Sequence, residues 1–256
     1  NGPGVLALNK IGLKIIDAKE IVEQARVIKS KEEIQCMKAS LEVCEKGVRL
    51  MRNELKAGIT EDELWSLFHK TNIEHGGEWI ECRMLTSGQR TNPWMQESSN
   101  KVIQQGDIVS FDTDMVGLYG YCADISRAFV EGHKFNSEQK KLYQMATDQI
   151  NHNAELIKAG LSFKEFVKKS WKLPEPYYGN RYACMVHGIG LCDEWPLIKY
   201  PTDGDQQGGQ FEKDMTVTVE SYIGEVGGKE GVKLEQQYLV GENGLKLMSH
   251  HPLEDL

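Results

Sequence analysis

One structural unit occurs twice in this chain of 256 residues, and the duplication limits the folds that the chain can adopt. A pattern of helix end, glycine, apolar residue, hydroxyl residue and glutamate occurs at 55–64 (LKAGITEDEL) and again at 157–166 (IKAGLSFKEF). In each copy a long amphipathic helix precedes the pattern, and two apolar strands follow it. We therefore expect the fold class α+β, in which duplicated helix-plus-antiparallel-strand units form one curved sheet with helices on its outer face.

Two capping boxes predict where helices begin. Ser30 and Thr60 are each followed three residues later by a glutamate, which is typical of a helix N-terminus. The expected helices cover 31–55, 61–69 and 136–158. Residues 79–85 are expected to form one strand before the first carboxylate-bearing hairpin.

Three carboxylates, those of Asp112, Asp114 and Asp124, lie within a predicted tight β-hairpin at 110–129. Its flanking strands are rich in apolar and β-branched residues, so the carboxylates should be buried. An unpaired buried charge costs several kcal/mol or more, so a positive partner is expected there. A metal ion is a compact partner. A solvated acidic loop is the alternative, and it fits three carboxylates on two apolar strands poorly.

The second copy adds Glu220 and Glu235, each within an apolar strand, and His187 lies on an apolar strand that runs into glycines. A single histidine in such a strand is more often structural, but five strand carboxylates favour metal ligation here. This oxygen-rich set suits Mn, Fe, Co or Zn. Two divalent ions about 3.5–4 Å apart would neutralise its charge best.

Net charge and the distribution of apolar residues limit the kinds of partner and the compartment that can be expected. The formal net charge of -8 argues against nucleic acid and anionic membranes as partners. The sequence shows no apolar run of membrane-spanning length and no signal-peptide pattern, so we expect a cytoplasmic protein. Six cysteines without a C-x-x-C pair suggest reduced thiols.

The order of the candidate ligands on a duplicated unit resembles the pita-bread fold, which methionine aminopeptidase, Xaa-Pro peptidases, prolidase and creatinase share. The resemblance extends from about Val27 to the end of the chain. It implies a catalytic domain at 27–256 and, at 1–26, the tail of a missing N-terminal domain or a linker. It also implies a homodimer, because relatives commonly dimerise.

Two departures argue against peptidase activity. Peptidases of this fold carry a histidine after a Ser-Gly-x-x-x-x-Pro turn, where this chain has Trp94, and a second histidine where it has Glu194. Those histidines handle the proton and oxyanion chemistry of amide hydrolysis. In addition, the spacing from Asp112 to Asp124 is one residue longer than in peptidases, so Asp112, Asp114 or both could ligate the metal.

These departures resemble one branch of the superfamily, the DddP-type dimethylsulfoniopropionate lyases. The matching segments are 76–81 (GGEWIE), 90–94 (RTNPW), 111–114 (FDTD) and 185–197 (MVHGIGLCDEWPL). The resemblance implies Asp193 as the catalytic base and Tyr182 as a nearby catalytic tyrosine. It also implies iron, as one or two ions, bound by Asp112, Asp114, Asp124, His187, Glu220 and Glu235.

The residues are consistent with this chemistry. Cleavage of dimethylsulfoniopropionate to acrylate and dimethyl sulfide is a β-elimination, so no water attacks and the hydrolytic histidines are not needed. Aromatic faces favour a sulfonium cation by roughly 0.5–2 kcal/mol each, and Trp94, Trp195 and Tyr182 are the candidates for substrate binding. The alternatives are core packing for the tryptophans and a salt bridge or helix cap for Asp193.

Two other functions remain open. The first is that of an Xaa-Pro peptidase of the same fold, and the second is that of a non-catalytic binding module.

Overall fold

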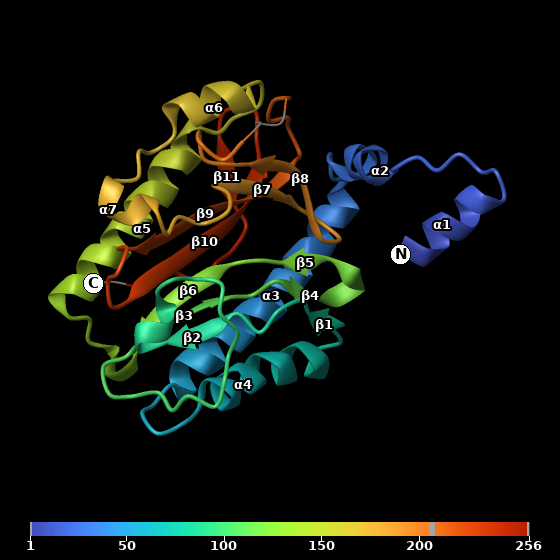
Figure 1. The fold of residues 1–256 in the computed structure, drawn as a ribbon. Coiled ribbons are helices and arrows are strands. Elements are labelled where there is room, and N and C mark those ends of the chain that lie inside the picture. Colours follow the sequence, from blue (N-terminus) through green and yellow to red (C-terminus); the bar gives the residue numbers. More distant parts are fainter. Residues whose placement is uncertain (1, 205–207, 255) are drawn as a thin grey trace.

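Two halves of similar construction make up the protein (Figure 1). The computed structural model describes residues 2–204, 208–254 and 256. In the first half, helices α3 (Lys31–Glu54) and α4 (Glu61–Glu74) cover a sheet of β2 (Leu85–Ser87), β3 (Ile108–Asp112) and β6 (Ser126–Val130). In the second half, α5 (Ser137–Leu156) packs against the central strands of a sheet ordered β11-β10-β9-β7-β8, and α6 (Phe163–Lys169) packs on α5.

The remaining elements complete the second sheet and add a small third sheet and several short helices. The second sheet consists of β7 (Val186–Ile189), β8 (Asp193–Ile198), β9 (Thr216–Gly224), β10 (Gly231–Val240) and β11 (Leu245–Leu247). A small third sheet joins β1 (Trp79–Ile80), β4 (Met115–Val116) and β5 (Cys122–Ala123). The other helices are α1 (Gly2–Lys10), α2 (Lys19–Arg26), α7 (Glu175–Tyr178) and the 3-10 turns η1 (Gly88–Thr91), η2 (Leu118–Gly120) and η3 (Glu131–His133).

The predicted duplication is confirmed in detail. Gly58 and Gly160 both adopt a left-handed backbone, with φ of +97° and +87°, which only glycine tolerates easily. The next hydroxyl residues, Thr60 and Ser162, both cap a helix by accepting a hydrogen bond from a backbone N–H three residues later. Each of these hydroxyl residues also forms an isolated β-bridge to a later segment of its own half. The α+β fold expected from the repeat is therefore correct.

The two halves meet where strand β10 packs against β6 and β3. Arg127 of β6 is fully buried and donates hydrogen bonds to the carbonyl of Glu235 (2.7 Å) and to Oε1 of Gln236 (2.8 Å), both on β10. One large apolar cluster also includes Ile108, Ala128 and Val130 of the first half together with strands of the second half. The halves therefore share apolar packing as well as polar contacts, and the Arg127 contacts lie on a strand that carries a predicted ligand.

Two sequence expectations need correction. The second helix continues past residue 69 to Glu74, because Asn72 is buried and donates to carbonyls of the small sheet, and Gly76 with φ of +83° lies just beyond the helix. The strand expected at 79–85 is interrupted. Its start, β1, pairs with β4, whereas its end, β2, pairs with β3, so the chain must bend to serve two sheets.

The N-terminal segment lies outside the core. Neither α1 nor α2 has a buried residue, and α1 stands apart from the sheets in Figure 1. Among the described hydrophobic residues, burial starts at Val27. Helix α2 nevertheless contacts β8. All six cysteines are free thiols, and no helix within the described ranges is long and apolar enough to cross a lipid bilayer.

The capping box of α3 gives the first prediction. The Ser30 hydroxyl accepts from the Glu33 backbone N–H, and the Glu33 carboxylate accepts from the Ser30 N–H. Ser30→Ala should therefore lower the free energy of unfolding by about 1 kcal/mol, as the loss of an N-cap usually does. Urea denaturation would measure this. Ser137→Ala, at an exposed first-turn position of α5, is the control and should change little. Equal effects of the two substitutions would contradict the assignment.

Candidate metal centre and active-site cavity

Sheet register gathers the predicted ligands at the junction of the two halves. Glu220 and Glu235 are direct partners in the antiparallel pairing of β9 with β10. Asp112 ends β3 opposite the start of β6, and Asp124 lies two residues before that start. His187 lies on β7, beside β9. All five side chains are buried. The structure thus brings together residues that are as far as 123 positions apart, as the sequence suggested.

The His187 ring faces carboxylates with both of its nitrogens. Its Nε2 atom lies 3.3 Å from Oε1 of Glu235, 3.5 Å from Oε1 of Glu220 and 3.6 Å from Oδ2 of Asp124. Its Nδ1 atom lies 2.9 Å from the Gly188 carbonyl. A proton on Nδ1 can be donated to that carbonyl, which leaves Nε2 free to ligate a metal among the carboxylates.

The ligand atoms form three overlapping groups, each within 4.8 Å. The groups are Asp124 with His187 and Asp193, His187 with Glu220 and Glu235, and Asp112 with Asp124 and Glu235. Asp124, His187 and Glu235 each belong to two of the groups, so the three groups form one connected site. The buried Oε1 atom of Glu235 has no hydrogen-bond partner among the described residues. This oxygen faces Nε2 of His187 at 3.3 Å, and a cation beside both atoms would satisfy the oxygen, so the donor set fits a bound metal.

Lys233 is a part of this centre that the sequence analysis missed. Its fully buried ammonium group lies 2.8 Å from Oε2 of Glu220, 3.0 Å from Oε2 of Glu235 and 3.0 Å from Oδ2 of Asp112. It therefore holds one oxygen of each glutamate and leaves the other oxygen toward His187. Because side chains alternate along a strand, its position two residues before Glu235 was a usable signal.

Charge compensation is incomplete without metal. Five ligand carboxylates, counting Asp114, and one ammonium leave four negative charges, which two divalent ions would balance. Burial raises the pKa of Asp112 to about 6, against the opposing effect of Lys233, and burial together with Glu235 raises the pKa of Glu220 to about 7. Metal-free, the centre therefore takes up protons near neutral pH.

The pKa values of His187 and Glu235 both shift against the effect of burial. Burial alone would lower the pKa of His187, but the carboxylates of Asp193 and Glu220 outweigh it and hold that pKa well above its ordinary value. Burial alone would raise the pKa of Glu235, but Lys233 and His187 outweigh it and hold that pKa below its ordinary value. In the metal-free protein Glu235 thus stays charged beside two cations.

Asp114 lies next to the ligand groups but belongs to none of the three among the described residues. It lines the cavity, and its backbone N–H donates to Oδ1 of Asp124 at 3.3 Å. Its φ of +33° departs from the usual strand backbone. Burial and the neighbouring Asp112 raise its pKa to about 9. Its position beside Asp124 keeps it available as the additional ligand that the sequence suggested.

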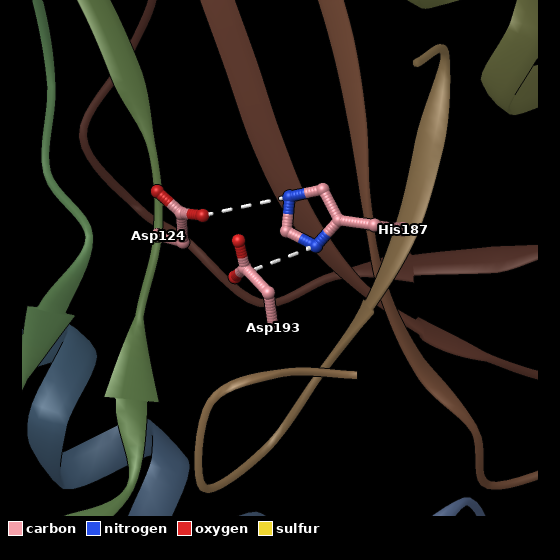
Figure 2. A group of neighbouring side chains, drawn as sticks. All are labelled: Asp124, His187 and Asp193. Atoms are coloured by element: carbon pink, nitrogen blue, oxygen red, sulfur yellow. Dashed lines mark ion pairs between the residues drawn. The ribbon is translucent and has the colours of Figure 1, made fainter. Parts of the chain in front are cut away.

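A cavity of about 320 Å³ opens onto the centre, and Asp193 lies in its wall. Figure 2 shows Asp124 and Asp193 facing the two ring nitrogens of His187. Oδ1 of Asp193 lies 3.6 Å from Nδ1, and the Asp193 side chain is 56% exposed. Asp193 begins strand β8, so it is not a helix cap. It combines access to solvent with proximity to the ligands.

Two of the three predicted aromatic residues line the cavity. These are Tyr182 and Trp195, whereas Trp94 is buried in a cluster with Met84 and Tyr222 and does not appear in the described lining. Trp94 and Tyr222 have ring centroids 6.0 Å apart. Tyr182 packs on this cluster, so Trp94 supports the wall from behind. Burial raises the pKa of the Tyr182 phenol well above its ordinary value, so it remains a hydroxyl.

Glu194, at the position of the second peptidase histidine, has a structural role here. Its buried carboxylate lies 2.8 Å from Nζ of Lys29 and 3.1 Å from Nε of Arg26, and it accepts the backbone N–H of Leu191. These partners occupy both of its oxygens. It therefore cannot replace an imidazole in proton transfer to a leaving group.

Lys233 gives the second prediction. In the metal-free protein, Lys233→Met should lower the free energy of unfolding at pH 7.5 by about 3–5 kcal/mol, because it leaves buried carboxylates unpaired. Asp112 and Glu220 bind protons more tightly when folded than when unfolded, so folded-state stability increases as the pH falls from about 7 toward 4. Lys233 lowers the pKa of both carboxyl groups, so its loss makes the variant gain more stability than the parent as the pH falls, and the deficit should shrink at pH 5.5. Thermal or urea unfolding at both pH values measures it.

The control is Lys70→Met, which removes an exposed ion pair with Glu74 on α4. Such a pair contributes about 0–1 kcal/mol, at either pH. A Lys233→Met deficit that matched this control, or that grew at pH 5.5, would contradict the charge balance described above.

Known metalloenzymes share this fold. The sequence profile of metallopeptidase family M24 matches residues 35–242. The chain is 38% identical to dimethylsulfoniopropionate lyase DddP of Roseovarius nubinhibens and 39% identical to that of Roseobacter denitrificans, over 98% of this chain and 58% of each relative. It thus spans little more than half the length of those lyases.

The Xaa-Pro dipeptidase structure from Bacillus anthracis superposes with a TM-score of 0.82 at 26% identity, covering 96% of this chain and 68% of that one. With a family profile that covers most of its length and the pita-bread arrangement of its two halves, the chain belongs to metallopeptidase family M24.

Proposed function

We propose that this protein is a metal-dependent carbon–sulfur lyase that cleaves dimethylsulfoniopropionate to acrylate and dimethyl sulfide. The observation that carries the proposal is the place of Asp193, whose carboxylate lines the cavity beside the ligand groups. The two positions that serve hydrolysis in peptidases are instead occupied by buried Trp94 and by ion-paired Glu194. The similarity to two named lyases supports the same reaction.

The reaction needs a base and a place for a neutral sulfide to leave. Asp193 takes the proton from the carbon next to the substrate carboxylate, and that C–H electron pair forms the new double bond. The C–S bond breaks, and its electrons leave with sulfur as dimethyl sulfide. Because its side chain is 56% exposed, Asp193 can return its proton to solvent. Trp195 and Tyr182 offer aromatic faces to the sulfonium group.

The metal, when bound, would hold the substrate carboxylate and stabilise the negative charge that develops beside it. The residues that would hold it are Asp112, Asp124, His187, Glu220 and Glu235, with Asp114 as a further ligand. Lys233 keeps the two glutamates turned toward His187. The Tyr182 hydroxyl remains protonated and can donate a hydrogen bond within the cavity.

The decisive experiment measures dimethyl sulfide released from dimethylsulfoniopropionate by the iron-loaded protein. Asp193→Asn and Asp193→Ala should each lower kcat at least about 100-fold, since general-base catalysis contributes that much. Both variants should keep their metal, because the remaining ligand groups do not need Asp193. Asp148→Asn, at an exposed position of α5, is the control and should keep full activity.

The rival function predicts a different outcome. A parent protein that hydrolyses an Xaa-Pro dipeptide and releases no dimethyl sulfide would be a peptidase, as its family and the Bacillus anthracis structure allow. A folded, metal-replete Asp193→Ala variant with parental lyase activity would refute the assignment of the base.

We also propose iron as the metal and a homodimer in the cytoplasm, with a catalytic domain at 27–256 and a linker or domain tail at 1–26. The oxygen-rich ligand set supports a hard divalent ion. The start of core burial at Val27 supports the boundary.

Elemental analysis should find up to two iron ions per chain, and light scattering should give the mass of two chains. A monomer, or a preparation that is active with zinc alone, would contradict these assignments.

A further inference from the structure

Helix α2 supplies part of the cavity wall, although it lies outside the core. Lys19 and Glu23 of α2 line the cavity together with Trp195, Asp193 and Asp114. No residue of α2 is buried in the core, and the helix has no side-chain cap. Its position over the cavity must therefore come from specific contacts rather than from an apolar face.

The C-terminal end of α2 is fixed by the buried C-cap Val27 and by the ion pairs of Glu194, which reach back to the last residue of the helix. Arg26, the last residue of α2, and Lys29 both reach this one buried carboxylate, at 3.1 Å and 2.8 Å. Nζ of Lys29 also donates to the Arg26 carbonyl at 2.6 Å, and Nη2 of Arg26 donates to Sγ of Cys192 at 3.5 Å. Glu194 lies directly after Asp193 in the chain. The start of strand β8 therefore carries both the proposed base and the residue that holds α2 over the cavity.

Glu23 is the acidic side chain of α2 that lines the cavity and is largely shielded from solvent. Only 13% of its side chain is exposed, and among the described residues its ion-pair partner is Lys19 at 3.7 Å, whose side chain is 75% exposed. Such a loose pair with an exposed lysine is worth little. Among the described residues Glu23 belongs to none of the metal-ligand groups. A partly buried carboxylate that faces a cavity in this way favours a cationic ligand.

We propose that Glu23 recognises the cationic end of the substrate and that the Arg26–Glu194–Lys29 ion pairs hold α2 so that it can do so. This assignment rests on the proposed function, because it places the substrate carboxylate at the metal and the sulfonium group toward the cavity wall. Trp195 contributes an aromatic face from the same wall. Glu23 is then a specificity-determining residue, and Glu194 is a positioning residue that acts through it.

The test compares two ligands that differ only in charge. Dimethylsulfoniopropionate has a sulfonium centre where 4-methylpentanoate has a neutral C–H group of the same shape. Calorimetry on metal-loaded protein in an Asp193→Asn background measures binding without turnover. Glu23→Gln should weaken binding of the sulfonium ligand about tenfold, a typical effect for one charge-assisted contact, and should change binding of 4-methylpentanoate less than about twofold. With Asp193 intact, it should raise KM and leave kcat near parental.

The matched control is Glu20→Gln, which removes an exposed charge from the same helix and does not line this cavity. It should change neither ligand's affinity, because screening by solvent weakens its field. Equal weakening of both ligands by Glu23→Gln, or no change in either, would overturn the proposal. A parent that binds the sulfonium ligand selectively but releases no dimethyl sulfide would refute the lyase function and leave the charge recognition standing.

A separate measurement, hydrogen exchange, tests whether Glu194 holds α2 in place. Glu194→Gln should speed hydrogen exchange of the α2 amides at 19–26 and reduce the preference for the sulfonium ligand although Glu23 is unchanged. Lys29→Met should produce the same two effects more weakly, because Arg26 retains its pair with Glu194. Unchanged exchange in both variants would show that other contacts hold α2 and would refute the role given to Glu194.

Discussion

The burial of several carboxylates at one place is the constraint on which the rest of this structure depends. Charges buried in a sheet must be compensated, and Lys233 supplies only part of what Asp112, Glu220 and Glu235 require. The remainder calls for metal ions. Since the carboxylates come from both copies of the repeat, the same compensation that makes the centre also joins the two halves. The fold and the site therefore share one set of interactions.

The chemistry depends on how polar groups are distributed around the cavity. A ligand set deep in the sheets can hold a substrate carboxylate, whereas Asp193 lies where solvent reaches it. An elimination needs a base that can discharge its proton, and it needs no group that activates water. Tyr182 and Trp195 surround the remaining space with aromatic surface. This arrangement of buried ligands, an exposed base and aromatic lining residues suits a small zwitterion better than a peptide.

The sequence predicted the repeat and the paired strands, because strand periodicity and helix caps are local signals, and the candidate ligands that it singled out lie together in the structure. It did not predict the role of Lys233, since a lysine in a chain usually indicates surface, and only the paired strands show that its ammonium is buried. It placed Trp94 among the substrate contacts, whereas packing against Tyr222 puts that ring behind the wall. The contribution of Glu23 depends on where α2 packs, which no local pattern encodes. Tertiary contacts decided each of these cases.

The use of Glu194 as an anchor affects how such a protein could change its reaction. A histidine at this position would restore one part of a hydrolytic centre, but it would also leave Lys29 without its carboxylate partner and would free the helix that closes the cavity. Single replacements on the path between the two activities therefore lose one property before they gain the other. A functional exchange at position 194 would therefore require a compensating change at Lys29 or Arg26, because both cations depend on the same carboxylate.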